Sequence, residues 1–395
     1  MSRRNHRDMK AVILAAGEGS RFSPLTATRP KSMLRIGRIP LLEHIVRGLV
    51  DLGISKLTLV VGHKRERIQS HFQNGSDWNV DIQYAVQDNP RGTGDALLTA
   101  EHEVSESCIV INGDRIVEPE LIERLIEKHE ATGDACLAVT EVEDPLQYGA
   151  VEVEEGHITA IEEKPDPHQI SSNLVNAGVY AFGPEIFAAI RQTDHYGELQ
   201  LTDTLDQYLE SHPVHAVHYD GMWLELSRPW DLLSVNSGIL ARDDSTVSPS
   251  AHVDDDATLG DPVVVGDHSR IQPGARVLRN TVVGENVTIG ANAVITNSVI
   301  LEDAVVGPGT VVSDSIIGAG SEIGPLNALE GGTSNIEVNG ELHTDVRFGG
   351  LVGDGVTTGS NVTITPGTIV GNQATIESGS TLSERVPGDA HVFRG

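Results

Sequence analysis

Hydrophobic and polar positions follow two different patterns along the chain, and the pattern changes near Ser245. Up to about Asn236, short apolar runs alternate with amphipathic stretches, a pattern typical of a mostly parallel sheet covered by helices. Buried strands are predicted at residues 11–14, 57–61, 82–86, 108–111 and 135–139, and helices at 41–52, 65–72 and 119–131. This part of the chain therefore predicts an α/β domain.

After Ser245 aliphatic residues recur every six positions, and glycines and β-branched residues multiply. The period runs through Val247, Val253, Leu259, Val265, Ile271, Val277, Val283, Ile289 and Ile295, slips by one at Ile300, continues at Val306 and Val312, slips again at Ile317, reaches Ile323, and resumes after an insertion at Val352, Thr358, Ile364, Val370, Ile376 and Leu382. A solenoid of short strands stacks each aliphatic residue on the next. The pattern predicts a parallel β-helix rather than a repetitive sandwich, with 385–395 as a cap or tail because they break the period.

A glycine-rich turn follows the first predicted strand, in the string Ala-Ala-Gly-Glu-Gly-Ser-Arg that ends at Arg21. Glycines let backbone amides approach phosphate oxygens, and a concave row of amides stabilises an anion. Arg21 and Lys31 add two cations in an otherwise acidic chain. The spacing differs from that of a P-loop, so the turn indicates a phosphate site of another kind.

The string LAAGEGSRFSPLTATRPK resembles the N-terminal signature of the sugar-1-phosphate nucleotidyltransferases, and the repeats resemble the left-handed β-helix tail of archaeal and bacterial members. The resemblance covers nearly the whole chain. It implies a Rossmann-like nucleotidyltransferase domain at 9–240 and a left-handed parallel β-helix domain of hexapeptide repeats at 245–395. Residues 1–8 are expected to be a disordered N-terminal extension.

The resemblance assigns nucleotide binding to two segments. The backbone at Leu14, Ala15, Ala16 and Gly17 would hold the nucleotide, with Arg21 and Lys31 on its phosphates as catalytic cations, and Gln87, Gly92 and Thr93 would read the base. A glutamine amide offers both a donor and an acceptor, which suits the imide edge of uracil or thymine better than a purine. Plain turn geometry would also explain Gly92 and Thr93.

A magnesium site is expected after the strand at 108–111. A carboxylate at the carboxyl end of a parallel strand lies where α/β ligands bind, and the resemblance makes Asp114 a catalytic magnesium ligand. The family takes its second ligand from a W-x-D-x-G segment, which here reads Trp-Leu-Glu-Leu-Ser. Glu225 therefore replaces the aspartate and Ser227 the glycine, and both departures leave metal geometry and activity open.

The resemblance places the sugar phosphate near Asn112, Gly113, Gly149, Glu163, Lys164 and Asn176. Glu163 and Asn176 would bond sugar hydroxyls, and Lys164 would meet the phosphate. An isolated Glu-Lys pair is otherwise a solvated surface pair. The segment containing Thr202 and Asp203 also matches the family, although helix capping explains it equally well.

The formal charge of -29 changes what the protein can bind. It argues against nucleic acid and against a membrane surface, because both carry negative charge, and it suggests a halophilic source, where salt screens self-repulsion. Cys108 and Cys136 lack metal-ligand spacing and are expected to be buried and reduced. No apolar run has the length of a membrane span, so a cytoplasmic protein is expected.

The resulting hypothesis is an enzyme that makes a UDP- or dTDP-sugar and pyrophosphate from UTP or dTTP and a sugar 1-phosphate, with glucose 1-phosphate favoured and Mg²⁺ as cofactor. A bifunctional enzyme that also acetylates glucosamine 1-phosphate is one alternative. The catalytic H-L-x-Y segment of such tails reads Pro-Leu-Asn-Ala at 325–328, and His343 is expected to be an exposed loop histidine. A non-catalytic regulatory homologue is the other alternative. The tail is expected to support a homotrimer.

Overall fold

The chain divides into two compact units that interleave along the sequence in this computed structural model. The structure describes residues 9–166, 172–242 and 245–394, so the predicted extension at 1–8 lies outside the described residues. The first unit contains 1–18, 30–33 and 41–225, and the second contains 19–29, 34–40 and 226–395. Within the described ranges, no helix is both long and apolar enough to cross a bilayer. The domain boundary near 240–245 remains a prediction.

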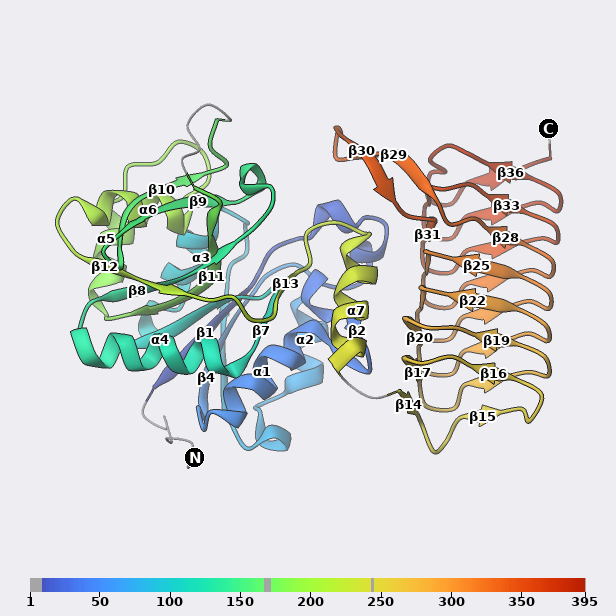
Figure 1. Cartoon of the computed structure of the whole chain (residues 1–395), viewed down its shortest axis with the longest axis horizontal. Helices are drawn as coiled ribbons and strands as arrows, with labels where there is room; N and C mark the ends of the chain where they lie inside the picture. Colours follow the sequence, from blue (N-terminus) through green and yellow to red (C-terminus); the bar gives the residue numbers. More distant parts are fainter. Residues whose placement is uncertain (1–8, 167–171, 243–244, 395) are drawn as a thin grey trace. The chain divides into compact units, whose positions relative to one another are not determined.

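The first unit is built on a nine-stranded sheet in the order β5-β4-β1-β6-β11-β8-β12-β10-β9. Its strands are β1 (Lys10–Ala15), β4 (Lys56–Val61), β5 (Asp81–Val86), β6 (Cys108–Asn112), β8 (Ala135–Glu141), β9 (Gly149–Glu154), β10 (His157–Glu163), β11 (Leu174–Phe182) and β12 (Val214–His218). The strands β5, β4, β1 and β6 are parallel, β11 runs against both β6 and β8, and β12 runs parallel to β8. Figure 1 labels β1, β4, β8, β9, β10, β11 and β12 of this sheet. The mostly parallel sheet is confirmed.

The helices of the first unit are α1 (Leu41–Asp51), α2 (Arg65–Phe72), α3 (Thr93–Thr99), α4 (Pro119–Thr132), α5 (Glu185–Gln192) and α6 (Leu201–Leu209). Two short strands, β7 (Arg115–Val117) and β13 (Trp223–Glu225), pair antiparallel beside the sheet. The helices at 41–52, 65–72 and 119–131 and all five strands predicted from the sequence are present, with ends within two residues of the prediction.

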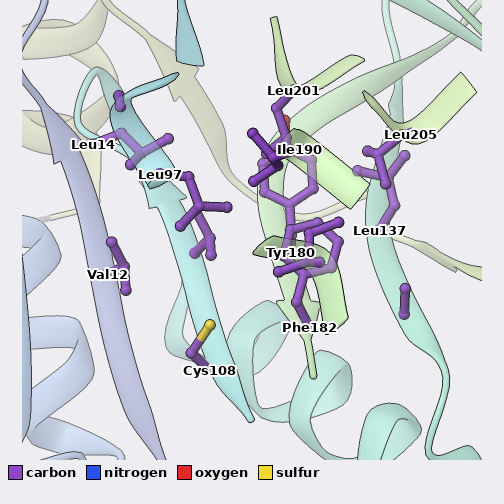
Figure 2. Packing of buried hydrophobic residues seen from close by; sticks show 14 of the residues in the cluster. Val12, Leu14, Leu97, Cys108, Leu137, Tyr180, Phe182, Ile190, Leu201 and Leu205 are labelled. Atoms are coloured by element: carbon purple, nitrogen blue, oxygen red, sulfur yellow. The ribbon is translucent and has the colours of Figure 1, made fainter. Parts of the chain in front are cut away.

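One hydrophobic core packs the face of the sheet against α3, α5 and α6 (Figure 2). Val12 and Cys108 come from neighbouring strands, Tyr180 and Phe182 stack on β11, and Leu201 closes the cluster from α6. Both cysteines are free and buried, as predicted. Burial raises the pKa of each thiol to about 12, so both remain protonated and inert at neutral pH.

The second unit contains a coil of short parallel strands that form three sheets (Figure 1). The first sheet contains β14 (Thr246–Val247), β17 (Val263–Val265), β20 (Thr281–Val283), β23 (Val299–Ile300), β26 (Ile316–Ile317), β31 (Gly350–Val352) and β34 (Thr368–Val370). The second contains β15 (His252–Val253), β18 (Arg270–Ile271), β21 (Thr288–Ile289), β24 (Val305–Val306), β27 (Glu322–Ile323), β32 (Thr357–Thr358), β35 (Thr375–Ile376) and β37 (His391–Val392). The third contains β16 (Thr258–Leu259), β19 (Arg276–Val277), β22 (Val294–Thr296), β25 (Val311–Ser313), β28 (Ala328–Leu329), β33 (Thr363–Ile364) and β36 (Thr381–Leu382). The predicted parallel β-helix is confirmed.

The predicted slips in the six-residue period are coils that are one residue shorter. Val265 pairs with Val283, eighteen positions on, whereas Val283 pairs with Ile300 and Ile300 with Ile317, each seventeen positions on. Asn297 and Asp314 adopt left-handed backbone conformations at the shortened corners, and the Asn297 amide donates to the Asp314 carboxylate over 2.7 Å. Asparagine and aspartate tolerate that conformation better than most residues.

Two details of the predicted period are wrong. The repeat continues past Ile323 to Leu329, which pairs with Ile364, and the insertion then forms a hairpin of β29 (Thr333–Val338) and β30 (Glu341–Arg347). The end of the chain is not a separate cap: β37 pairs in parallel with β35, and Val386 bridges to Val370. The strands continue because their backbone groups still find partners on the preceding coil although the spacing has changed.

Three other parts of the sequence belong to the second unit. Residues 19–29 carry the short helices η1 (Ser20–Phe22) and η2 (Leu25–Ala27), and 34–40 form the hairpin of β2 (Arg35–Ile36) and β3 (Ile39–Pro40). The helix α7 (Asp231–Arg242) packs on this hairpin, where the fully buried Asn236 accepts a hydrogen bond from the backbone of Gly37 at 2.7 Å. These parts precede the β-helix in sequence yet share its compact unit.

Candidate functional site

Predicted site residues of the first unit gather where the parallel strands end. Ala15 ends β1 and is followed by Ala16 and Gly17. Gln87 follows β5, and Asn112, Gly113 and Asp114 lie at the end of β6. The backbone N–H of Gly113 donates to the carbonyl of Leu14 at 2.9 Å, and a Cβ on Gly113 would lie 2.7 Å from that oxygen. Gly113 therefore allows the turn after β6 to approach the end of β1. The carboxyl edge of a parallel sheet is where α/β proteins bind ligands.

Asp114 forms an ion pair with Lys31, which lies on η3 (Lys31–Met33). The Lys31 ammonium is 2.8 Å from the Asp114 carboxylate, and the side chains are 19% and 25% exposed. Burial raises the pKa of Asp114, but the charges of Lys31 and Arg115 outweigh it and hold the pKa well below the ordinary value of an aspartic acid. The carboxylate is therefore ionised at neutral pH beside a cation that is partly exposed to solvent.

Arg115 was not predicted as a site residue, yet it lies at the centre of this cluster. The antiparallel β7–β13 pair sets Arg115 directly opposite Glu225, and their side chains form an ion pair. The guanidinium carbon lies 4.9 Å from the centroid of the Trp223 ring and 5.9 Å from that of Tyr148. Only the tryptophan of the W-x-D-x-G segment could have pointed to this arrangement, because the pairing joins positions far apart in sequence.

The donors present suit a magnesium ion that shares its coordination with a phosphate. One Asp114 oxygen, Oδ1, is buried and accepts no hydrogen bond in the described part of the chain, although Arg115 Nε lies 3.7 Å from it, so this hard acceptor is only partly satisfied. Among the described residues, no three His, Cys, Asp or Glu side chains gather as a metal cage. Magnesium usually keeps water and substrate oxygens around one or two protein carboxylates, so a site of few ligands fits it.

Gln87 is held in one orientation by the turn that follows it. Its side chain is buried, and its amide nitrogen donates to the Asp95 carboxylate at 2.8 Å and to the carbonyl of Gly92 at 3.2 Å. A carboxylate accepts but does not donate, which distinguishes the nitrogen of the amide from its oxygen. Asp95 therefore fixes the orientation of the Gln87 amide, with its nitrogen rather than its oxygen towards the carboxylate.

The turn at Gly92 requires glycine. Gly92 has a φ of 101°, and a Cβ there would lie 2.2 Å from the carbonyl oxygen of Leu199. The Thr93 hydroxyl donates to Gln200 at 3.1 Å and accepts from the backbone of Leu201 at 2.9 Å. These contacts join the starts of α3 and α6, so Gly92 and Thr93 have a structural role whether or not they also touch a base.

Three predicted sugar-facing residues lie together with Thr202. Gly149 pairs with Glu163 across β9 and β10, and a Cβ on Gly149 would lie 3.2 Å from a Glu163 oxygen and 3.6 Å from Asn176. The Thr202 hydroxyl donates to Glu163 at 3.3 Å. Asp203, one residue on, accepts from the backbone of Gln200 in the capping box that begins α6, so the capping explanation holds for Asp203.

Asn176 connects this group to Asp114 and its neighbours. Its amide donates to the Tyr180 hydroxyl at 2.7 Å and accepts from the backbone of Gly178 at 2.8 Å. A Cβ on Gly178 would meet the side chains of Asn112 at 2.9 Å and Arg115 at 3.2 Å.

Lys164 is exposed, and its backbone N–H donates to the carbonyl of Tyr148 at 2.9 Å.

Arg21 belongs to the second unit, where it is exposed on η1, and its role remains a prediction.

His343 also lies in the second unit, and it is not the exposed loop histidine that the sequence suggested. It sits on β30 with a side chain only 12% exposed, 5.2 Å from Trp230 between ring centroids. Burial, followed by the charge of Arg228, lowers its pKa. The expectation failed because the insertion folds as a hairpin rather than as a loop.

Comparison with known proteins agrees with this geometry. A model of the nucleotidyl transferase family matches residues 10–242, which is more than half of the chain. The chain belongs to the nucleotidyl transferase family. A model of the GMPPB C-terminal domain matches 269–348, and a hexapeptide repeat of succinyl-transferase matches 351–384. Hexapeptide repeats and three parallel sheets together are consistent with the left-handed hand expected for the β-helix.

Individual relatives support the same family. The chain is 38% identical to the bifunctional protein GlmU of Methanocaldococcus jannaschii over 59% of this chain, but the match spans only about half of that relative, 54% of its length. It is 37% identical to the UTP–glucose-1-phosphate uridylyltransferase AglF of Haloferax volcanii, over 56% of this chain and 93% of the relative. A UDP-glucose pyrophosphorylase solved with UDP-glucose matches with a TM-score of 0.55 and 25% identity, covering 60% of this chain and 99% of that one.

Proposed function

We propose that the protein is a sugar-1-phosphate nucleotidylyltransferase, which joins a nucleoside triphosphate to a sugar 1-phosphate and releases pyrophosphate. The observation that carries the proposal is the Lys31–Asp114 pair at the carboxyl edge of the sheet, beside the glycine-rich turn after β1. A carboxylate for a metal and a cation for phosphates are the two charges that phosphoryl chemistry at this edge requires. The resemblance to AglF supports the same activity.

The chain would work by orientation and charge neutralisation. The sugar phosphate oxygen attacks the α-phosphorus in line, the bond from the α-phosphorus to the β-phosphate bridging oxygen breaks, and pyrophosphate leaves. Lys31 and Arg21 would stabilise the negative charge on the leaving phosphates. Because a sugar phosphate is already ionised at neutral pH, no side chain has to remove a proton, and no covalent enzyme intermediate is needed.

Magnesium would be held by Asp114, with Glu225 as the second carboxylate. When bound, a magnesium ion neutralises phosphate charge and draws the reacting oxygens together. In this structure Lys31 pairs with Asp114 and Arg115 pairs with Glu225. For Glu225 to act as a ligand it must share or release Arg115, and the freed guanidinium would then face a phosphate.

Gln87 supports a pyrimidine as the base. Its nitrogen is committed to Asp95 and Gly92, so its oxygen is the end that would accept the imide N–H of uracil or thymine. UTP and dTTP both carry this group, and the AglF relative favours UTP. Leu14, Ala15, Ala16 and Gly17 would contribute backbone contacts to the nucleotide, and Gly92 and Thr93 would shape the base site.

The sugar 1-phosphate would meet Glu163 and Asn176 through its hydroxyls, with Gly149 leaving room for the ring and Asn112 and Gly113 beside the phosphate. Lys164, which is exposed, would complete the phosphate site. Glucose 1-phosphate is the favoured substrate, and AglF carries that substrate in its name. N-acetylglucosamine 1-phosphate is the second choice.

The alternative of a second, acetyltransferase activity has little support in the tail. Asn327 stands in the segment that corresponds to the catalytic motif, and it is only 2% exposed. Its amide donates to the Thr358 hydroxyl at 2.6 Å and accepts from the backbone of Val362 at 2.7 Å. These contacts join two successive coils of the β-helix. We therefore assign the tail a structural role, including assembly of a homotrimer.

A regulatory homologue without catalysis is the second candidate, and the ion pair between Glu225 and Arg115 favours it. A carboxylate bound to arginine is less available to a metal than a free one. Catalysis with magnesium distinguishes the two candidates. The acidic composition and the Haloferax relative also support a halophilic source, so assays belong in concentrated salt.

The experiment is a substrate screen. Pyrophosphate release is measured in high salt with magnesium, for UTP and dTTP each paired with glucose 1-phosphate, N-acetylglucosamine 1-phosphate and glucosamine 1-phosphate. The proposal expects one pairing to dominate and Asp114→Ala to abolish it. A folded protein that releases no pyrophosphate with any pair would contradict the proposal and favour the regulatory candidate.

A further inference from the structure

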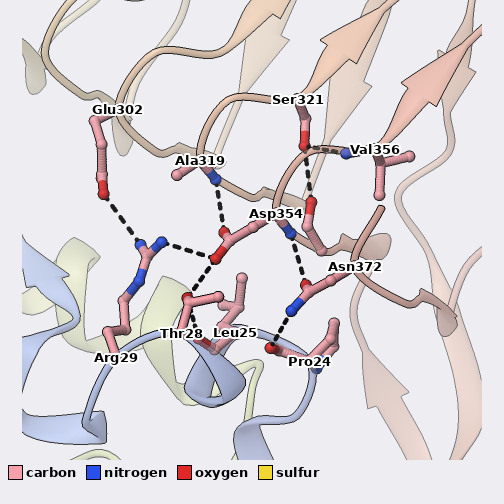
Figure 3. Close-up of polar contacts among 11 residues, drawn as sticks. Pro24, Leu25, Thr28, Arg29, Glu302, Ala319, Ser321, Asp354, Val356 and Asn372 are labelled. Atoms are coloured by element: carbon pink, nitrogen blue, oxygen red, sulfur yellow. Dashed lines mark hydrogen bonds and ion pairs between the residues drawn. The ribbon is translucent and has the colours of Figure 1, made fainter. Parts of the chain in front are cut away.

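The segment 20–29 is bound to the coils of the β-helix by a buried polar network (Figure 3). Its centre is Asp354, which follows β31 and is 6% exposed. One oxygen of its carboxylate accepts hydrogen bonds from the Thr28 hydroxyl at 2.5 Å and from the Arg29 guanidinium at 2.9 Å. The other oxygen accepts from the backbone of Ala319 at 2.8 Å. Both oxygens of Asp354 are therefore occupied.

Further contacts extend the network to both ends of the segment. Arg29, itself 9% exposed, also pairs with Glu302 at 3.3 Å. Asn372 donates to the carbonyl of Pro24 at 3.0 Å, and its oxygen accepts from the backbone of Asp354 at 2.7 Å. At the other end, Asn339 at the tip of the β29–β30 hairpin donates to the Ser20 hydroxyl at 2.9 Å.

The segment 20–29 is part of the N-terminal signature string, LAAGEGSRFSPLTATRPK, to which the phosphate contacts are assigned. It begins three residues after Gly17, contains Arg21, and ends two residues before Lys31. Arg21 is exposed and immediately follows Ser20, one of the attached positions. A buried arginine that is fully paired, as Arg29 is, cannot serve a ligand. Arg29 therefore has an anchoring role, whereas Arg21 remains open to solvent.

We propose that Asp354 is a positioning residue: through Thr28 and Arg29 it holds the segment 20–29 on the β-helix, and so keeps Arg21, the cation that the proposed function assigns to the phosphates, in one conformation. This inference rests on the proposed function. It gives the β-helix a part in the nucleotidyl transfer that is separate from assembly. Holding a cation in place before the substrate arrives removes an ordering cost from binding.

The perturbation is Asp354→Ala in the full-length protein. Thr28→Val is a second variant: it removes the hydroxyl that contacts Asp354 and the Leu25 carbonyl, and it leaves the residues of the β-helix unchanged. The matched control is Asn327→Ala, which also removes a buried polar side chain that bridges coils of the β-helix but touches no residue of 20–29. Arg29→Lys tests how far a shorter cation can keep the anchoring that Arg29 provides.

Two readouts are compared in high salt: the KM for the nucleotide against that for the sugar phosphate, and the rate of trypsin cleavage after Arg21, identified by mass spectrometry. Asp354→Ala is expected to raise the nucleotide KM and the cleavage rate by on the order of tenfold or more, because a buried charge pair is broken. Thr28→Val should raise both by roughly three- to tenfold, the effect of one hydrogen bond. Arg29→Lys should raise both by less than Asp354→Ala does, because the charge remains, and the KM for the sugar phosphate should not change in any variant.

The inference is overturned if Asp354→Ala or Thr28→Val leaves cleavage after Arg21 at the wild-type rate, or if Asn327→Ala raises the nucleotide KM as much as they do. The cleavage assay needs no catalysis. Faster cleavage of Asp354→Ala in a protein that turns over no substrate would support the anchoring while refuting the proposed function, so the two failures are distinguishable.

Discussion

Replacing Lys31 with methionine tests whether this cation serves the phosphates or only the fold. The substitution keeps most of the side-chain length and removes the charge that lies 2.8 Å from Asp114. Both partners keep some solvent access, and Arg115 Nε remains 3.7 Å from the same carboxylate. The loss in the free energy of unfolding should therefore be small, about 1 kcal/mol, with a fall in Tm of roughly 2–4 °C.

The expected loss of activity is much larger. Removing one charge-stabilising group from a transition state typically lowers kcat by on the order of 10²–10³. Lys31→Met should therefore lose far more in kcat than its change in stability explains. Steady-state pyrophosphate release and thermal unfolding, measured in the same high-salt buffer, give the two quantities.

The matched control is Arg191→Met, which removes the cation of the Arg191–Glu101 ion pair on α5. Its kcat should stay within about twofold of the wild type, since surface pairs contribute little. If Lys31→Met lowered kcat by less than threefold, or lowered it no more than Arg191→Met, the phosphate role of Lys31 would be refuted.

Three further outcomes are expected. Gly92→Ala should raise the nucleotide KM about tenfold and lower the Tm, because its Cβ would lie 2.2 Å from the Leu199 carbonyl at a φ of 101°; an unchanged KM would contradict the strain argument. Burial raises the pKa of Glu43, but hydrogen bonds from His71 and Arg47 lower it overall; the stability from this depressed pKa is present above about pH 4.5 and is lost as the pH falls further. The Tm of Glu43→Gln should therefore lie further below that of the wild type at pH 7 than at pH 4. An equal difference at the two pH values would refute this. The two thiols, with pKa values raised to about 12, should react with a maleimide only after unfolding; labelling of the native protein would contradict their burial.

The sequence predicted those features whose cause is local. An apolar run followed by Asn-Gly-Asp places Asp114 at the end of β6, and the six-residue period places the aliphatic residues inside the β-helix. Even the shortened coils were visible as slips in that period. In each case the residue types along the chain determine the structure, with little dependence on distant partners.

Features that depend on distant pairing could not be predicted. An apolar run does not indicate whether its strand lies parallel or antiparallel to its neighbours in the sheet. The antiparallel β11 between β6 and β8 was therefore not predicted. The approach of Arg115 to Glu225 follows from the pairing of β7 with β13, more than 100 positions apart. Asp354 reads as an ordinary turn residue in sequence, and only folding brings it to Thr28 and Arg29.

The most direct test of the proposed activity is detection of its product. Wild-type protein, incubated in high salt with magnesium, UTP and glucose 1-phosphate, is analysed by mass spectrometry for UDP-glucose, and pyrophosphate is quantified in the same sample. The proposed function predicts UDP-glucose and pyrophosphate in equal amounts, and neither from Asp114→Ala. Folded wild-type protein that forms no nucleotide sugar from UTP or dTTP with any of the three sugar phosphates would contradict it.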